Sequence, residues 1–223
     1  MTFDDFKKQF EIFSKIDTAE KLAICESQYE KHLLHIEDEN YFEPIENDLG
    51  DDMVSLYEKN LKKILCFDTI RENQINFLVR PSFEPEYFLA LEKIQGKFAL
   101  TLTTLTKNYW AVFYADNKII NIERKVITTE LNTAIGDKLF NLLDKVFTQA
   151  RQPEAGRFVL DGVVYRLSKL LNGQQKIVSK HSPSDSSKSG QIIEILQHLI
   201  DNIESLNDTV LLNIETKIIN VQA

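Results

Sequence analysis

Two histidines and a glutamate in HLLHIEDE are the first residues whose types and spacing suggest chemistry. His32 and His35 stand three residues apart, and Glu39 follows four residues after His35. On a helix, two such imidazoles share a face and with a carboxylate resemble a metal site. The HExxH spacing is absent, however, and no further His or Cys cluster completes a ligand set. We therefore interpret both as surface histidines and expect neither a metal nor a cofactor.

The two cysteines, Cys25 and Cys66, are the candidates for a catalytic nucleophile. Cys25 falls on the apolar side of a helical segment, and Cys66 lies in the apolar run ILCF. No family signature of a catalytic cysteine surrounds either of them. Because unpaired cysteines are commonly buried, we predict core packing for both and a reducing compartment for the protein.

A serine-rich loop, HSPSDSSKSG at 181–190, precedes a helical segment and superficially resembles a phosphate-binding loop. The pattern G-x-x-x-x-G-K-[ST] is not met, because the first Gly is missing and Lys188 precedes Gly190. A serine that caps the helix explains the loop without a ligand. His181 is expected at a strand end, with no nucleophile or acidic partner specified for it.

The segment EDENYFEPIENDLGDD, residues 37–52, holds eight carboxylates and no Lys or Arg. The whole chain has 34 acidic and 26 basic residues and a formal net charge of -8. The entire charge excess therefore lies in this one segment. A nucleic-acid-binding protein would show a basic excess, so the sequence argues against that function.

Aromatic and apolar residues are interleaved with the acids of this stretch, which suits a recognition surface better than a solvated loop. The stretch does not match the spacing of a calcium-binding loop. A concentrated negative patch would steer a basic partner and raise its rate of association. We predict a partner-binding surface formed by Glu37, Asp38, Glu39, Tyr41, Phe42, Glu43, Glu46, Asp48, Asp51 and Asp52.

The elements that must position these residues begin with three predicted helices. The first contains Phe3, Phe6, Phe10, Phe13 and Ile16 at steps of three and four, with a Thr2–Asp5 capping pair. The second begins at Asp17 or Thr18, and the third runs from Asp52 to Leu65. The expected buried faces are Leu22, Cys25, Tyr29, Leu33 and Ile36 in the second helix and Leu56, Leu61, Ile64 and Leu65 in the third.

The middle of the chain changes to a strand period and predicts an antiparallel meander of about four or five strands. INFLV at 75–79 is one strand, and FLALEKI and KFALTLTTLT form a hairpin about Gln95-Gly96. YWAVFYA at 109–115 is rich in aromatic residues and favours a strand, with Trp110 in the core. KIINIERKVI is expected to return from a turn at Asp116-Asn117.

The last third predicts a long amphipathic helix at about 130–150, followed by two tight turns and another helix. The long helix places Leu131, Ile135, Leu139, Leu142, Leu143, Val146 and Phe147 on one stripe. Asp161-Gly162 favours a hairpin in RFVLDGVVYRL, and Asn172-Gly173 gives a second turn. QIIEILQHLIDNIE buries Ile192, Ile195, Leu196, Leu199 and Ile203, whereas the tail TVLLNIETKIINV fits either a helix or a strand.

These elements predict an α+β protein with N-terminal helices, an antiparallel β-meander, a long amphipathic helix, a second β-hairpin unit and a C-terminal helix. We expect a single domain over residues 1–223, with a soft boundary near residue 70 between a helical part (1–69) and a sheet-and-helix part (70–223). No 18-residue apolar stretch and no secretory signal is visible, so we expect a cytoplasmic location without membrane contact.

Residues 130–204 carry a recognisable order: a long helix, FVLDGVVYRL, a strand that reaches HSP, and a serine-rich entry into an amphipathic helix. This arrangement resembles small cytosolic immunity proteins and other bacterial proteins of toxin systems. The resemblance implies an inhibitor that binds a cognate toxin and does no chemistry, and it assigns no site residue.

An acidic surface would then occupy the basic cleft of a toxin that cuts nucleic acid. Two alternatives stay open: a metal-dependent enzyme that uses the loop carboxylates, and a structural or adaptor protein with another partner. The sequence does not specify the partner or the oligomeric state.

Overall fold

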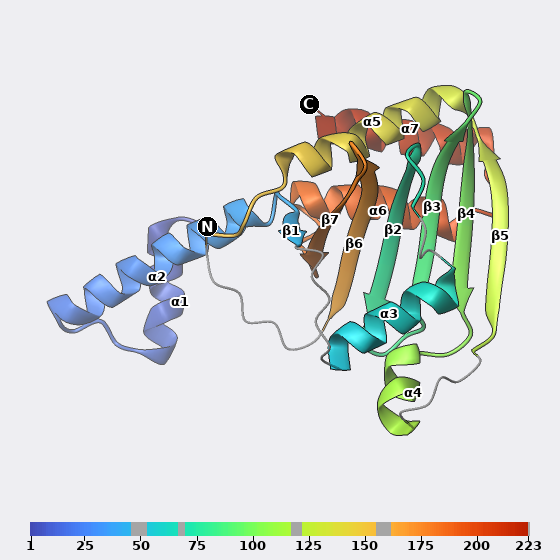
Figure 1. Cartoon of the computed structure of the whole chain (residues 1–223). Helices are drawn as coiled ribbons and strands as arrows, with labels where there is room; N and C mark the ends of the chain where they lie inside the picture. The colour runs from blue at the N-terminus through green and yellow to red at the C-terminus, as the bar shows by residue number, and fades with distance from the viewer. Residues whose placement is uncertain (46–52, 67–69, 117–121, 155–161, 223) are drawn as a thin grey trace.

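The computed structural model describes residues 1–45, 53–66, 70–116, 122–154 and 162–222. Within these ranges the chain forms seven helices and seven strands, and the strands make one antiparallel sheet (Figure 1). The predicted α+β class is confirmed. None of the helices in these ranges has the length and apolar character needed to cross a membrane.

The sheet has the strand order β1-β7-β6-β2-β3-β4-β5. Successive side chains of its central strands point to opposite faces, and both faces are buried. In β2, for example, Phe77 and Val79 face one core and Leu78 faces the other. The strands are β1 (Glu43–Ile45), β2 (Gln74–Pro81), β3 (Tyr87–Ile94), β4 (Lys97–Leu105), β5 (Arg124–Leu131), β6 (Val163–Leu171) and β7 (Gln174–His181).

Two tight hairpins fix the register of this sheet. Gln95 and Gly96 connect β3 to β4, and Asn172 and Gly173 connect β6 to β7. All four residues have positive φ, as a type I′ turn requires, and this turn matches the twist of the flanking strands. Both turns were predicted, and both are confirmed.

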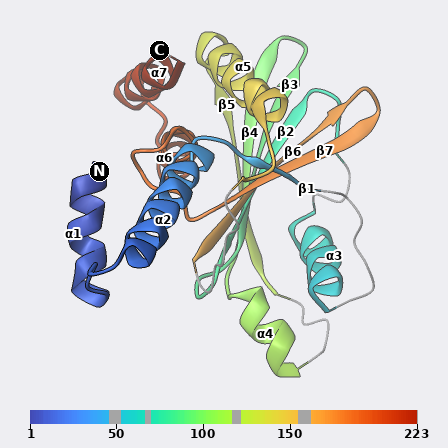
Figure 2. The ribbon, with the colours of Figure 1, turned by 90° about the vertical axis from the view of Figure 1, so that its left-hand side faces the viewer.

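Helices cover both faces of the sheet (Figure 2). On one face, α5 (Thr133–Gln149), α6 (Lys188–Asp201) and α7 (Asp208–Gln222) form the larger core with the strands. On the other, α3 (Met53–Leu65) and α4 (Tyr109–Asp116) cover a smaller core. The predicted buried stripe of α6 is confirmed. The stripe of α5 is confirmed from Ile135 to Val146, whereas Leu131 is the last residue of β5 and Phe147 is only partly buried. The tail, for which two structures were open, is the helix α7.

The first two helices, α1 (Phe3–Phe13) and α2 (Ala19–Asp38), project from the sheet as an arm (Figure 1). Thr2 and Thr18 cap them as expected. In α1, Phe3 and Phe6 pack on Tyr29 of α2, while Phe13 is 90% exposed. The buried face predicted for α2 is only partly right, because Cys25 is buried but Leu22 and Tyr29 are half-buried. Leu33 and Ile36 are exposed as well, as is Leu56 of α3.

The strand predicted at 109–115 is wrong, because these residues form α4. The cause is tertiary: the buried carboxylate of Glu86 accepts hydrogen bonds from the backbone N–H groups of Tyr109 and Trp110. Asn108 accepts another from Ala111. These acceptors satisfy the first turn of a helix and outweigh the β-propensity of the aromatic residues. The turn predicted at Asp116-Asn117 lies partly outside the described residues.

The hairpin predicted at Asp161-Gly162 lies mostly outside the described residues, which resume at Gly162. β6 begins at Val163 and pairs with β2 on one edge and with β7 on the other. β1, from the N-terminal side of residue 70, pairs with β7 near the C-terminus, so segments from both sides of the proposed soft boundary build one sheet.

Candidate functional site

The acidic stretch begins at the C-terminal end of α2, and its first residues lie against the body of the molecule. Phe42 is 2% exposed and belongs to the larger core. The Asp38 side chain is also buried. The Phe42 side chain thus enters the core and brings the acidic residues next to it to the edge of the sheet.

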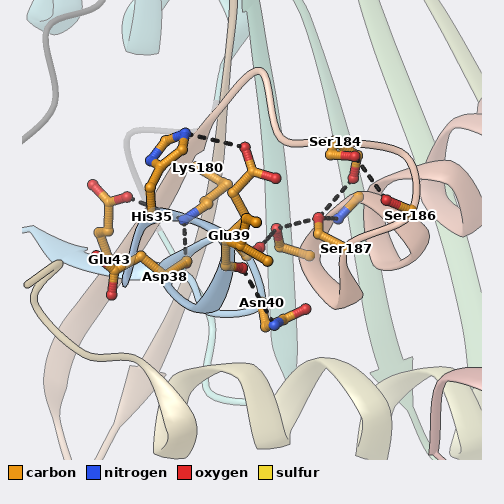
Figure 3. A network of polar contacts seen from close by, with 12 residues as sticks. His35, Asp38, Glu39, Asn40, Glu43, Lys180, Ser184, Ser186 and Ser187 are labelled. Carbon is orange, nitrogen blue, oxygen red and sulfur yellow. Dashed lines mark hydrogen bonds and ion pairs between the residues drawn. The ribbon is translucent and has the colours of Figure 1, made fainter. Parts of the chain in front are cut away.

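Lys180, near the end of β7, is fully buried beneath this segment. Its Nζ donates to the backbone carbonyl of Asp38 at 2.6 Å and lies 3.2 Å from Oε1 of Glu43 (Figure 3). A buried ammonium group is costly unless it is paired and hydrogen-bonded. Lys180 therefore requires these acceptors and fixes the end of α2 and the start of β1 to β7.

Arg151, just after α5, binds the same turn from the other side. It donates to Oε1 of Glu37 at 3.0 Å and lies 3.5 Å from Oδ1 of Asp38. Its guanidinium carbon stands 4.0 Å from the centroid of the Tyr41 ring, a cation–π contact. The negative charges at the start of the acidic stretch are thus compensated by cations from distant parts of the chain.

The serine-rich loop completes these contacts at the start of α6. Ser187 is the N-cap of α6, with its Oγ accepting from the backbone N–H of Gly190, so the predicted serine cap is confirmed. Ser189 donates to the backbone carbonyl of Glu39, and the backbone N–H of Lys188 donates to the side chain of Asn40. The Ser189 contact supplies a donor to the Glu39 carbonyl at the C-terminal end of α2, where backbone carbonyls lack partners within the helix.

We call this set of contacts the α2 anchor: Lys180, Arg151 and Ser189 with the groups that they bind at residues 37–43. Six of the ten predicted partner-binding residues belong to this region, namely Glu37, Asp38, Glu39, Tyr41, Phe42 and Glu43. Asp38 and Phe42 have interior side chains and offer no contact surface. Glu46, Asp48, Asp51 and Asp52 lie outside the described residues. The partner-binding role of the stretch stays a prediction.

Both histidines of α2 are half-buried and contact neighbouring side chains. His32 packs beside Phe6, and Nε2 of His35 lies 3.6 Å from Glu39. Among residues that the structure describes, no three His, Cys, Asp or Glu side chains are grouped to hold a metal.

One of the two cysteine predictions is wrong. Cys25 is buried as predicted, whereas Cys66 is exposed. Cys66 follows the last residue of α3 at a positive φ, where the chain leaves the core, and Arg124 Nη1 lies 2.6 Å from its Sγ.

A second polar cluster, which sequence reasoning missed, lies under α3 on the opposite face of the sheet. Glu58 pairs with both Arg80 of β2 and Arg166 of β6, each at 2.7 Å. Burial tends to raise the pKa of Glu58, but the two arginines outweigh it and hold the pKa below its usual value. Burial and the like charge of Arg166 lower the pKa of Arg80. The sequence does contain a signal for this cluster, since Arg80 and Arg166 each interrupt an otherwise apolar strand.

Glu86 is the other buried carboxylate on this face. It is fully buried and accepts from the Tyr57 hydroxyl at 2.7 Å and from the backbone N–H groups of Tyr109 and Trp110 at 2.7 and 2.9 Å. Burial, together with the adjacent carboxylate, raises the pKa of the Tyr57 hydroxyl. Glu86 thus joins α3 and α4 to the sheet through three hydrogen bonds to one charged acceptor.

Comparisons of the chain with models of protein families, with curated proteins and with solved structures find no match.

Proposed function

We propose that the chain binds a basic protein and acts by forming a complex with it, as an immunity-type inhibitor that neutralises a bacterial toxin. The observation that carries the proposal is the concentration of the whole charge excess in residues 37–52. An acidic segment of this kind fits the basic active-site cleft of an enzyme that acts on nucleic acid. The proposal includes a cytoplasmic location, where an inhibitor would protect the cell that makes it.

The α2 anchor suggests a division of roles within the stretch. Arg151 and Lys180 compensate Glu37, Asp38 and Glu43. Glu39 lies beside His35, and the last four acids, Glu46, Asp48, Asp51 and Asp52, are called here the distal acids. We assign partner recognition to the distal acids and positioning of the segment to the earlier ones.

Anchoring has an energetic benefit for such a partner-binding segment. Ordering a loop on binding opposes association, and a segment that starts from a fixed point loses less freedom. The distal acids then supply a local negative field, which raises the association rate of a basic partner and weakens with salt.

The metal-dependent alternative receives less support from the described carboxylates. Glu37, Asp38 and Glu43 are already paired with protein cations, which a metal ion would have to displace. Titration with Mg²⁺ or Mn²⁺ separates the two functions, because only the metal-dependent enzyme binds such an ion stoichiometrically. An adaptor protein would bind its partner through the same acids but would give no protection against a toxin.

The proposal is tested by affinity capture from extracts of the cells that naturally make the protein, at about 50 and about 500 mM salt. The test variant is Glu46→Gln, Asp48→Asn, Asp51→Asn and Asp52→Asn. We expect the wild-type chain to capture a basic protein at low salt and the variant to lose it.

A matched control changes the net charge equally at exposed positions elsewhere: Glu11→Gln, Glu26→Gln, Glu30→Gln and Glu72→Gln. The control should retain the partner. Equal capture by wild type and distal-acid variant would place the interface elsewhere, and capture of no protein by the wild-type chain would contradict binding itself.

A further inference from the structure

A cavity of about 450 Å³ lies on the α3/α4 face, where β2 ends and β6 begins. Its size falls within the usual range of small-molecule sites. Aromatic rings line much of it, from Tyr57 of α3, Trp110 of α4 and Phe83 after β2. Val164 adds aliphatic surface, and Arg80 contributes a charged group. The lining therefore combines flat apolar walls with one cation.

Among the described residues, cations outnumber carboxylates beside this cavity. Arg80 and Arg166 share the single carboxylate of Glu58, and Lys62 is close enough to act electrostatically on Glu58 and Arg166. Glu86, the other buried carboxylate of this face, is held by three neutral hydrogen-bond donors. Within the part of the chain that the structure describes, three cations, Arg80, Arg166 and Lys62, therefore stand against the carboxylates of Glu58 and Glu86.

Arg80 itself retains unused hydrogen-bonding capacity. Its Nη1 donates to Glu58 at 2.7 Å, while its Nε is buried and has no hydrogen-bond partner among the described residues. The guanidinium carbon lies 6.0 Å from the centroid of the Tyr57 ring. An arginine held between a carboxylate and an aromatic ring presents its planar group in a fixed orientation, which suits recognition of a carboxylate.

The wall opposite α4 is built from strand ends that hydrogen bonds hold together. The Ser82 hydroxyl and backbone N–H both donate to the carbonyl of Gly162, and the Gly162 N–H lies 3.1 Å from the Ser82 Oγ. A Cβ on Gly162 would collide with the side chains of Ser182 and His181. The two strand ends are thus closely packed, and this part of the cavity is preformed.

We propose that this cavity binds a small organic anion with a flat, apolar body, whose carboxylate pairs with Arg80. The aromatic walls accept the body, and the excess of cations among the described residues favours the anion over a neutral molecule. The test of this site does not depend on the proposed partner.

Trp110 makes the test direct, because it is the only tryptophan in the chain and it lines the cavity. The probes are 4-tert-butylbenzoate and its neutral counterpart 4-tert-butylbenzamide, titrated while tryptophan fluorescence is followed. We expect the carboxylate to bind about tenfold or more tightly than the amide, as one charge-assisted pair predicts. Arg80→Gln should abolish this preference, whereas Arg71→Gln, which removes an exposed arginine of another region, should preserve it.

Because Arg80→Gln also removes a partner of Glu58, a second variant leaves that ion pair intact. Ala111 lines the cavity from the exposed side of α4, so Ala111→Phe should fill the cavity and abolish binding of both probes while the far-ultraviolet circular dichroism stays unchanged. Equal binding of carboxylate and amide, binding that Ala111→Phe does not reduce, or no binding of either probe to the wild-type chain would each overturn the proposal.

Discussion

Replacement of Lys180 by Met tests the anchoring of the acidic stretch most sharply. Methionine is close to lysine in length and keeps the apolar stem in place, so the change mainly removes the ammonium group. The group makes a 2.6 Å hydrogen bond to the Asp38 carbonyl and a 3.2 Å ion pair with Glu43. The Lys180 side chain is fully buried, so solvent does not hydrate its ammonium group.

The expected loss of stability follows from these two contacts. Breaking a buried ion pair by removing one partner costs about 3–5 kcal/mol. Glu43 keeps 24% of its side chain exposed, so water hydrates the carboxylate that is left and reduces the loss. The Asp38 carbonyl keeps the backbone N–H of Tyr41 as a donor, and the loss of its charge-assisted hydrogen bond from Lys180 costs about 1.5–3 kcal/mol. We therefore expect Lys180→Met to lower the free energy of unfolding by about 3 kcal/mol.

Urea unfolding followed by circular dichroism measures this loss, with Lys176→Met as the control. Lys176 lies on the same strand but is exposed, so its replacement should change the stability by less than about 0.5 kcal/mol. A double-mutant cycle with Glu43→Gln isolates the ion pair, since the two losses should not add. Equal stability of Lys180→Met and wild type would refute the anchoring role of Lys180.

Three further predictions concern the buried carboxylates Glu86 and Glu58 and the close packing at Gly190. Glu86→Gln should lower the free energy of unfolding by about 2–4 kcal/mol, because a glutamine amide accepts hydrogen bonds only at its oxygen. Glu84→Gln, at an exposed position, should have little effect. Similar urea midpoints for the two variants would contradict this prediction. The pKa of Glu58 is lowered in the folded protein, so its stabilisation is present at neutral pH and is lost as pH falls below about 4.5. The urea midpoints of wild type and Glu58→Gln should differ at pH 7 and converge in acid, and parallel profiles would be inconsistent with the ion pairs. Gly190→Ala should lower the free energy of unfolding by about 1–3 kcal/mol in the same assay, since a Cβ would collide with the carbonyl of Ser184. An unchanged urea midpoint would show that the serine-rich loop shifts to accommodate the Cβ without loss of stability.

The elements that were predicted correctly carry their signal within a short window. The apolar stripe of α5 repeats through Leu139, Leu142 and Val146, and the stripe faces the core as its period requires. α4 has no such stripe, and what makes it a helix is Glu86, more than 20 residues upstream. Local propensity therefore gave the wrong structure where a distant side chain supplies the cap.

The same distinction explains what could be predicted about the candidate site. The excess of acids in residues 37–52 is visible in the sequence, but Lys180 is 142 residues from Asp38 along the chain. No local pattern indicates that Glu37, Asp38 and Glu43 are paired with Arg151 and Lys180. The arginines at 80 and 166 were likewise visible within apolar strands, and only the sheet register brings them to one carboxylate.

Partner recognition by the acidic stretch is tested most directly by the rate at which the chain associates with the captured basic partner, measured at several salt concentrations. We predict that the rate for the wild-type chain falls steeply between about 50 and about 500 mM salt, as screening shortens the reach of the distal acids. The variant with Glu46, Asp48, Asp51 and Asp52 neutralised should associate slowly and with little salt dependence. Equal rates and equal slopes for the two proteins would contradict a recognition role for the acidic stretch.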